Sequence, residues 1–242
     1  MNAFKNTGKA LKEKGFEIIQ DVLTDEECDT LINDAHSIVE KNRDDVNNFS
    51  PIMHPHKIDE ENNFFKIMKK KTIINLIQNI IKGPVMGLQS QFFFMPPDTP
   101  GFQPHQDDFY VKSQDPEGFV SLWIALTKIK KMNGPLRLWP GSHQKGIFEV
   151  RRKEMKEKKE KENTDKNGSE LYSVIPKELK DFQELEMNRG TGVLLHSRVL
   201  HSSRKNLSKN FRYAILYTFI KEGLRFNPGS NAKRETIKLD SA

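Results

Sequence analysis

Two histidines and one aspartate are spaced so that they could bind one metal ion. His105 and Asp107 are separated by a single residue, and His201 lies much further along the chain. In a strand, residues i and i+2 point to the same face, so His105 and Asp107 can bind one ion from one strand end. His201 must then come from a strand that lies alongside them. Two imidazoles and one carboxylate, with the other metal positions open, are the ligand set of non-haem Fe(II) oxygenases, so the pattern predicts an enzyme that activates dioxygen.

An arginine after the third candidate ligand is suited to bind a co-substrate. Three protein ligands leave about three positions of an octahedron open. A 2-oxo acid would fill two of them through its keto oxygen and carboxylate, which leaves one for dioxygen. Arg212 can hold the distal carboxylate of that acid through two parallel hydrogen bonds. The turn-like sequence at residues 205–210 would let His201 and Arg212 face one cavity from the two arms of a hairpin.

Four further histidines are weaker candidates for metal ligands. His54 and His56 flank prolines in a polar stretch, where ordinary loop residues are the favoured interpretation. His143 ends a Pro-Gly-Ser-His turn sequence and is not predicted to bind metal, although it could line the pocket. His196 lies five residues before His201, and an odd offset in a strand points the opposite way, so only one of the two can easily face the metal. The arginine that follows favours His201.

The first part of the chain predicts helices. Thr24 and Glu27 have the spacing of a capping box at a helix start. Apolar residues then recur with a helical period, at Leu31, Ile32, Ala35, Ile38 and Val39. Residues 64–82 predict one or two more helices, and residues 41–63 are polar and predict a loop.

From residue 85 onward the pattern predicts strands. Short segments rich in β-branched and aromatic residues occur at 85–95, 120–126, 192–195 and 213–220. Glycine and proline separate them, and Asn133-Gly134 predicts a hairpin turn. Many short strands between turns predict a sandwich or jelly roll. Helices followed by strands give an α+β class, with the N-terminal helices packed on the major sheet.

Length and composition favour a single domain over residues 1–242. No run of 18 apolar residues predicts a transmembrane helix, and the N-terminus lacks the apolar stretch of a signal peptide. The single cysteine, Cys28, cannot form an internal disulfide, is expected to be buried in a helix, and fits a reducing compartment. These features predict a cytoplasmic protein.

A charged low-complexity insertion is predicted at residues 151–168. Residues 151–166 hold eight basic and five acidic residues, which supply +3 of the net charge of +6. The favoured interpretation is a solvated, mobile insertion with local helix, and the alternative is an electrostatic gate for an anionic substrate. The run mixes both signs and lacks interleaved aromatic residues, which argues against binding to nucleic acid.

An ordered series of motifs resembles the phytanoyl-CoA dioxygenase (PhyH-like) family of Fe(II)/2-oxoglutarate oxygenases, which also includes ectoine hydroxylase. The resemblance extends from roughly residue 12 to residue 222. Its motifs are Lys14-Gly15-Phe16-Glu17-Ile18-Ile19, Leu23 to Cys28, His105-Gln106-Asp107 with Tyr110, Trp123 to Leu126, Asn133-Gly134-Pro135-Leu136, Pro140-Gly141-Ser142-His143, Leu200-His201-Ser202-Ser203, Asn206, Ser208 and Arg212.

The resemblance implies a fold and a set of site residues. The expected fold is a double-stranded β-helix (a cupin-like jelly roll), with iron at its open end. The implied iron ligands are His105, Asp107 and His201. The resemblance also implies that Arg212 binds the far carboxylate of 2-oxoglutarate, with help from Ser203, and that Gln89 contacts this co-substrate. It implies that Gln91 and Phe93 face the prime substrate. Trp123 is expected near the pocket.

Departures from ectoine hydroxylase bear on the substrate. Gln91, Phe93 and Met95 stand where that enzyme has Arg, Asn and Lys, which disfavours an ectoine-like substrate. Related halogenases lack the carboxylate ligand, so the presence of Asp107 favours hydroxylation.

The predicted function is therefore an Fe(II)- and 2-oxoglutarate-dependent dioxygenase. It would use O2 to hydroxylate an unactivated C–H bond of a small-molecule substrate and release succinate and CO2, with neither nucleic acid nor membrane as a partner. The alternative is a non-catalytic module that senses a metal or ligand on the same fold.

Overall fold

The computed structural model describes residues 7–42, 51–59, 61–152, 171–173, 176, 179, 181–230 and 233–239. The helices are α1 (Lys9–Lys14), α2 (Asp25–Asn42), α3 (Asn63–Met68), α4 (Lys71–Ile81) and α5 (Asp107–Val111). The strands are β1 (Phe16–Ile19), β2 (Ile52–Met53), β3 (Val85–Met95), β4 (Phe119–Ala125), β5 (Leu136–Leu138), β6 (Val150–Arg152), β7 (Leu171–Ser173), β8 (Gln183–Leu185), β9 (Gly192–His196), β10 (His201–Ser203), β11 (Arg212–Lys221) and β12 (Ile237–Lys238).

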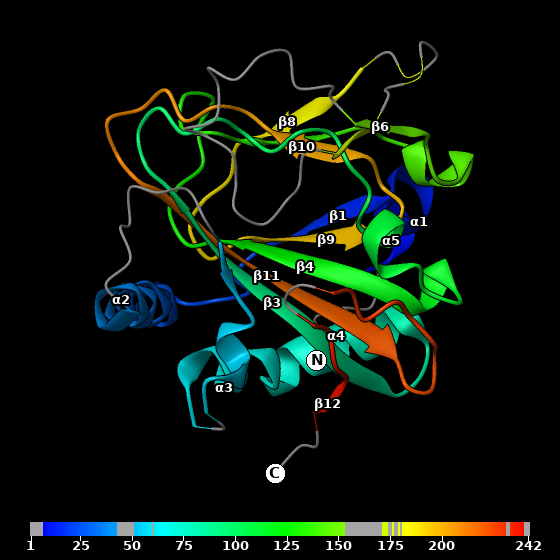
Figure 1. Ribbon diagram of the computed structural model, residues 1–242, viewed down its shortest axis with the longest axis horizontal. Coiled ribbons are helices and arrows are strands. Elements are labelled where there is room, and N and C mark those ends of the chain that lie inside the picture. Colours follow the sequence, from blue (N-terminus) through cyan, green and yellow to red (C-terminus); the bar gives the residue numbers. More distant parts are fainter. Residues whose placement is uncertain are drawn as a thin grey trace.

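The strands form two main antiparallel sheets. The major sheet has the order β1-β9-β4-β11-β3-β12, with β2 beside β3, and the minor sheet has the order β10-β5-β8. Helices α3 and α4 cover one face of the major sheet, and the minor sheet lies on its other side (Figure 1). The predicted α+β class and the packing of helices on the major sheet are confirmed. The two sheets face each other as in a jelly roll and do not close into one barrel.

The alternation of side chains along β11 divides the interior into two cores. Ile215, Tyr217 and Phe219 pack with the apolar faces of α2 and α4. Ala214 and Leu216 point the other way, into the core between the sheets. Since each fully buried large apolar side chain contributes about 1.5–3 kcal/mol, both cores stabilise β11 as the centre of the major sheet. This strand then presents its inner face to the space between the sheets.

The register of the major sheet arranges the inner face in rows. Arg212 of β11 lies opposite Met95 of β3, and the paired rows that follow are Ala214 with Phe93, Leu216 with Gln91, and Thr218 with Gln89. On the other side of β11, Trp123 lies opposite Leu216 and Ser121 lies opposite Thr218. The predicted pocket residues Gln89, Gln91, Phe93 and Trp123 therefore share one face of the sheet, as the period of two requires.

The chain after β11 returns to the same sheet. The Asn227 amide donates to the Val111 carbonyl at the end of α5 (2.6 Å). Farther on, β12 pairs with β3 at Gly87 and Met86. The described parts of the C-terminal segment, residues 222–230 and 233–239, thus lie against the end of α5 and along β3.

The helix predictions agree closely with the structure. The capping box forms, because the Thr24 amide donates to Glu27 Oε2 (2.9 Å) and the Glu27 amide donates to Thr24 Oγ1 (3.2 Å). Cys28 is fully buried in α2, as expected. Residues 64–82 form two helices, α3 and α4.

Three predictions about turns and loops are wrong. His201 and Arg212 are predicted to lie on the two arms of a hairpin, but β10 pairs with β5 in the minor sheet, whereas β11 pairs with β3 and β4 in the major sheet. Asn133-Gly134 is predicted to be a hairpin turn, but Asn133 forms an isolated bridge with Asn206, and β5 then pairs with β10 and β8. The turn lies earlier, where Asn133 Oδ1 accepts from the Lys130 amide (2.7 Å). The polar stretch 41–63 is also not loop throughout, since it contains β2, which extends the edge of the major sheet.

The predicted insertion at 151–168 lies almost wholly outside the described residues. The described strands that border this part of the chain, β6 and β7, pair antiparallel with each other.

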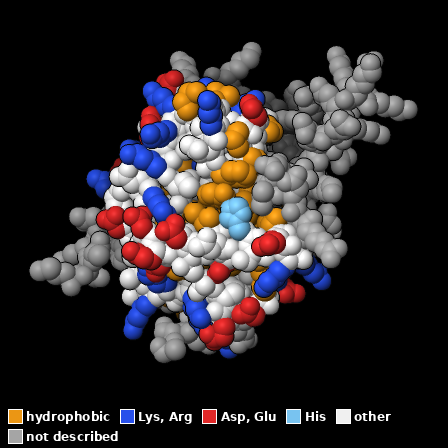
Figure 2. Space-filling model, turned by 90° about the vertical axis from the view of Figure 1, so that its left-hand side faces the viewer, with side chains coloured by type: hydrophobic (Ala, Val, Ile, Leu, Met, Phe, Trp, Pro, Cys, Tyr) orange, Lys and Arg blue, Asp and Glu red, His pale blue; other side chains and the backbone are white. Residues whose placement is uncertain are grey.

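The described surface mixes charge and hydrophobic groups. On the side where α2 lies, acidic and basic side chains are interspersed, and hydrophobic side chains gather beside one histidine (Figure 2). In the part of the chain that the structure describes, no helix is both long and apolar enough to cross a membrane.

Candidate metal and co-substrate site

The three predicted metal ligands come together from two segments that are far apart in the sequence. His105 and His201 form an isolated antiparallel bridge, in which each amide donates to the other's carbonyl at 2.9 and 3.0 Å. His201 is the first residue of β10. The expectation that His105 and Asp107 share a strand needs correction, because Asp107 is the first residue of helix α5. The turn into this helix, not the strand period, brings the carboxylate to the histidines.

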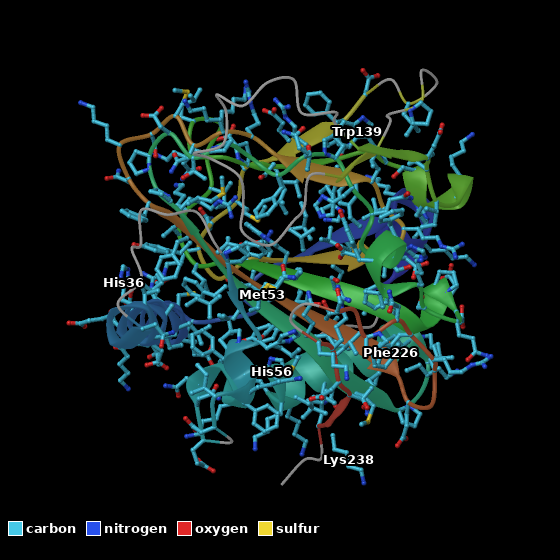
Figure 3. The ribbon with its side chains drawn as sticks, viewed as in Figure 1. His36, Met53, His56, Trp139, Phe226 and Lys238 are labelled. Atoms are coloured by element: carbon cyan, nitrogen blue, oxygen red, sulfur yellow. The ribbon has the colours of Figure 1, made fainter. Side chains whose placement is uncertain are left out.

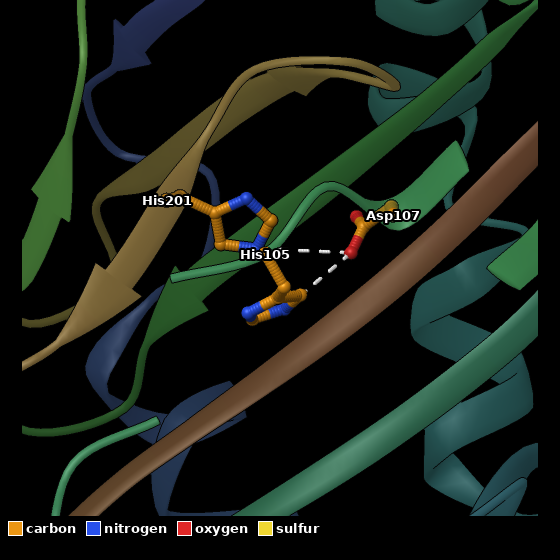
Figure 4. Close-up of side chains that lie close together, drawn as sticks. All are labelled: His105, Asp107 and His201. Carbon is orange, nitrogen blue, oxygen red and sulfur yellow. Dashed lines mark ion pairs between the residues drawn. The ribbon is translucent and has the colours of Figure 1, made fainter. Parts of the chain in front are cut away.

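The ligand atoms converge on one point. The Nε2 atoms of His105 and His201 lie 3.8 and 3.7 Å from Oδ1 of Asp107 (Figure 4). One ligand atom from each residue lies within 4.8 Å of the others, so the group could hold a metal ion. Two imidazole nitrogens and one carboxylate oxygen suit divalent iron.

Backbone carbonyls fix which ring nitrogen of each histidine carries the proton. His105 Nδ1 lies 2.7 Å from the Gln103 carbonyl, and His201 Nδ1 lies 3.0 Å from the Val199 carbonyl. Because a carbonyl oxygen can only accept, each Nδ1 must donate a hydrogen. The lone pair of each neutral ring then lies on Nε2, which faces Asp107 and is free to bind a metal.

Neighbouring groups also orient the Asp107 carboxylate and keep the His105 ring neutral. Ser121 Oγ donates to Asp107 Oδ2 (2.9 Å), which leaves Oδ1 for the metal. Thr218 Oγ1 lies 3.3 Å from the same hydroxyl. Burial, followed by the neighbouring His201 ring, lowers the pKa of His105 to about 4, against the opposing effect of Asp107. At neutral pH the ring is therefore unprotonated and can act as a ligand.

The other histidines have structural partners away from this point. His196 Nε2 lies 3.1 Å from Glu117 Oε1, and His143 Nε2 lies 3.0 Å from the Lys12 carbonyl. His56 Nδ1 lies 2.5 Å from Ser90 Oγ. His201 and not His196 belongs to the described metal-ligand group, as the sequence predicted. His54 and His56, predicted to be ordinary loop residues, are instead buried against β3.

A cavity of about 530 Å³ contains the metal-ligand group and every predicted pocket residue. Those residues are His105, Asp107, His201, Arg212, Ser203, Gln89, Gln91, Phe93 and Trp123. The structure thus brings the predicted residues together around one space, while their individual roles remain predictions.

Arg212 is buried in this cavity without a negative partner among the described residues. Its side chain is 1% exposed, and Nη2 donates to the Gly134 carbonyl (3.3 Å). Nε has no hydrogen-bond partner, and the guanidinium carbon lies 5.5 Å from the centre of the Trp123 ring. Burial lowers the pKa of Arg212 to about 9, so the group is charged at neutral pH. Such a cation fits a ligand carboxylate.

Sequence reasoning missed several residues of the site. Ser121 and Thr218 lie on the same face as Trp123 and Leu216, so the period of two along β4 and β11 could have found them. Arg234 also lines the cavity, and its Nε donates to Gln89 Oε1 (2.7 Å). No local pattern points to Arg234, because its position depends on how the C-terminal segment returns to β3.

Comparison with known sequences gives a family match. The profile described as Phytanoyl-CoA dioxygenase (PhyH) matches residues 11–214. A phytanoyl-CoA dioxygenase of Arabidopsis thaliana is 36% identical over 129 residues, which cover 52% of this chain and 41% of the relative. The chain spans about half the length of curated relatives that it matches.

Comparison with solved structures supports the fold. The non-heme monooxygenase ThoJ superposes with a TM-score of 0.74 at 15% identity, covering 96% of this chain and 83% of that protein. The epimerase SnoN, solved with Fe3+, alpha ketoglutarate and nogalamycin RO, gives a TM-score of 0.73 at 14% identity, covering 99% and 96%. Both likenesses extend over nearly the whole chain.

Replacing His201 by alanine should remove a metal ligand and weaken Fe(II) binding by more than about 100-fold. Loss of a residue that only hydrogen-bonds a metal ligand typically weakens metal binding by about 10- to 100-fold, and loss of the ligand itself should cost more. His196→Ala is the matched control and should stay within about threefold of wild type, since that ring contacts Glu117. Anaerobic equilibrium dialysis measures both affinities. An equal loss in the two variants would contradict the ligand set.

Replacing Ser121 by alanine should weaken Fe(II) binding by about 10- to 100-fold, because Asp107 would lose the donor that orients it. Ser113→Ala serves as control, since Ser113 Oγ donates to the neighbouring Asp108 (2.7 Å) and not to Asp107. The same dialysis measurement applies. Unchanged affinity in Ser121→Ala would show that the hydroxyl does not position the ligand.

Proposed function

Because the chain belongs to the phytanoyl-CoA dioxygenase family, we propose that it is an Fe(II)- and 2-oxoglutarate-dependent oxygenase. One observation carries the proposal. A two-histidine, one-carboxylate group and a buried arginine without a counter-charge among the described residues line the same cavity. The first suits ferrous iron, and the second suits the far carboxylate of a 2-oxo diacid.

The residues around the metal group would hold the iron in one orientation. The carbonyls of Gln103 and Val199 keep both imidazole Nε2 atoms unprotonated. Ser121 holds the second oxygen of Asp107. When bound, the iron supplies the oxidative chemistry in which dioxygen and 2-oxoglutarate yield succinate and carbon dioxide. The protein's part is to fix the ligands and to leave the remaining positions open.

Arg212 would bind and orient the co-substrate. An isolated buried charge is costly, and a carboxylate with two parallel hydrogen bonds offsets much of that cost. Ser203, at the end of β10, would add a hydroxyl contact, and the Trp123 ring supports the guanidinium from one side. The apolar side chains of Phe93 and Leu216 lie on the same face of the sheet and help to exclude water from the reaction.

We propose hydroxylation of an unactivated C–H bond as the reaction. Asp107 supplies the carboxylate ligand, whose loss makes room for halide in related halogenases, so transfer of hydroxyl is favoured over transfer of halogen. The cavity volume of about 530 Å³ suits a small-molecule substrate beside 2-oxoglutarate. Gln91 and Phe93 would face that substrate, and residues 1–242 would act as one catalytic domain.

Replacing Arg212 by methionine tests the proposal. Wild-type protein loaded with Fe(II) should consume 2-oxoglutarate and form succinate under air. Arg212→Met should raise the KM for 2-oxoglutarate by about 100-fold, since loss of a buried charge pair costs about 2–5 kcal/mol. The melting temperature without co-substrate should stay equal or rise, because the variant no longer buries an uncompensated charge.

Arg137→Met is the matched control. Arg137 lies on β5 and pairs with Glu184 (2.9 Å) outside the cavity, so the KM for 2-oxoglutarate should not change. An iron-loaded wild type that neither binds nor consumes 2-oxoglutarate would contradict the proposal and favour a metal- or ligand-sensing module.

A further inference from the structure

The C-terminal segment delivers a second arginine to the cavity. Arg234 lies between the turn near Asn227 and strand β12, and it lines the same cavity as the metal-ligand group. The family profile ends at residue 214, so this arginine lies outside the matched part of the chain. Its side chain is partly buried.

Arg212 and the row that holds Arg234 lie well apart along the inner face of the sheet. Arg234 is held by Gln89, whose row includes Thr218 of β11. Arg212 is six residues from Thr218 on the same strand, which corresponds to about 20 Å at roughly 3.3 Å per residue. The row of Leu216 and Gln91 lies between Arg212 and the Gln89 row. One bound 2-oxoglutarate held by Arg212 would therefore leave Arg234 for another ligand.

The Gln89 row also connects Arg234 to the metal side of the cavity. Thr218 lies beside Ser121, which in turn donates to Asp107. Burial lowers the pKa of Arg234, and the Asp107 carboxylate opposes that effect. Asp107 and Arg234 both line the cavity, so a ligand on Arg234 would share that space with the metal group.

The charges of the cavity favour a second anion. In the proposed loaded site, iron and Arg212 bring three positive charges, and Asp107 with the two carboxylates of 2-oxoglutarate brings three negative charges. These cancel. Arg234 and Lys112 also line the cavity, and among the described lining residues no other carboxylate balances them. Neither shows an ion pair within the described parts of the chain.

We propose that Arg234 binds an anionic group of the prime substrate, so that the substrate is a small molecule carrying a carboxylate or a phosphate. Gln89 is then a positioning residue, because its Oε1 accepts from Nε and so fixes the guanidinium while both terminal amino groups stay available to an anion. This assignment replaces the predicted contact of Gln89 with 2-oxoglutarate. It rests on the proposed function, since it assumes that Arg212 holds the co-substrate.

Binding of matched probes tests the assignment. Protein loaded with Fe(II) and saturated with 2-oxoglutarate under argon is titrated with hexanoate, hexyl phosphate or the neutral hexanamide, and ligand-observed NMR gives each Kd. Wild type should prefer at least one of the two anions over the amide by about 10-fold or more. Arg234→Gln should lose that preference, and Arg234→Lys should keep part of it. The preferred anion distinguishes a carboxylate substrate from a phosphate substrate.

Lys238→Gln is the control, because it removes one positive charge from the same segment. Lys238 lies on β12, is exposed, and projects away from the sheet (Figure 3). It should keep the wild-type preference, and melting curves of all variants report folding.

Three outcomes would overturn the assignment. They are equal binding of the three probes to wild type, a preference that survives in Arg234→Gln, and loss of 2-oxoglutarate binding in Arg234→Gln. The last would place Arg234 in the co-substrate site. Failure of the proposed function is a different result, namely that wild type itself does not bind 2-oxoglutarate.

Discussion

The two backbone hydrogen bonds between His105 and His201 are the contact on which the site depends. They join the segment after β3 to the minor sheet, so they align two imidazoles that are far apart in the sequence. Helix α5 begins directly after this bridge and brings Asp107 to the same point. Backbone pairing holds the ligands of this metal site in place. Such a site is more rigid than one whose ligands come from independent loops. Loss of the pairing would separate the ligands even if every side chain remained.

The positively charged side chains of the cavity lie in different parts of it. Arg212 is the first residue of β11, Arg234 is held by Gln89 in the middle of β3, and both line the cavity that contains the metal-ligand group. Arg212 is fully buried and supported by Trp123, whereas Arg234 is partly buried and held by Gln89. The more enclosed cation suits the co-substrate that every turnover uses. In the proposed account, the cation on the C-terminal segment suits an anionic group of the prime substrate.

Local patterns predicted most of the fold, because they report which faces are buried. The capping box at Thr24, the helical period of α2 and the exact span of β3 follow from residues close in sequence. The prediction of a hairpin turn at Asn133-Gly134 is wrong, because the Asn133 side chain closes an earlier turn and the Asn133 backbone pairs with Asn206. Asp107 was placed on a strand for lack of any signal for the short helix α5. Arg234 could not be found at all, because its place depends on long-range pairing of β12 with β3.

The central claim is that the metal-ligand group and Arg212 together bind 2-oxoglutarate on ferrous iron. The most direct measurement is an anaerobic titration of Fe(II)-loaded protein with 2-oxoglutarate, followed by visible absorption. A charge-transfer band that saturates at one equivalent of 2-oxoglutarate per iron is the predicted result. Protein that demonstrably holds iron but develops no band would contradict the account, because the open metal positions would then not accept the 2-oxo acid.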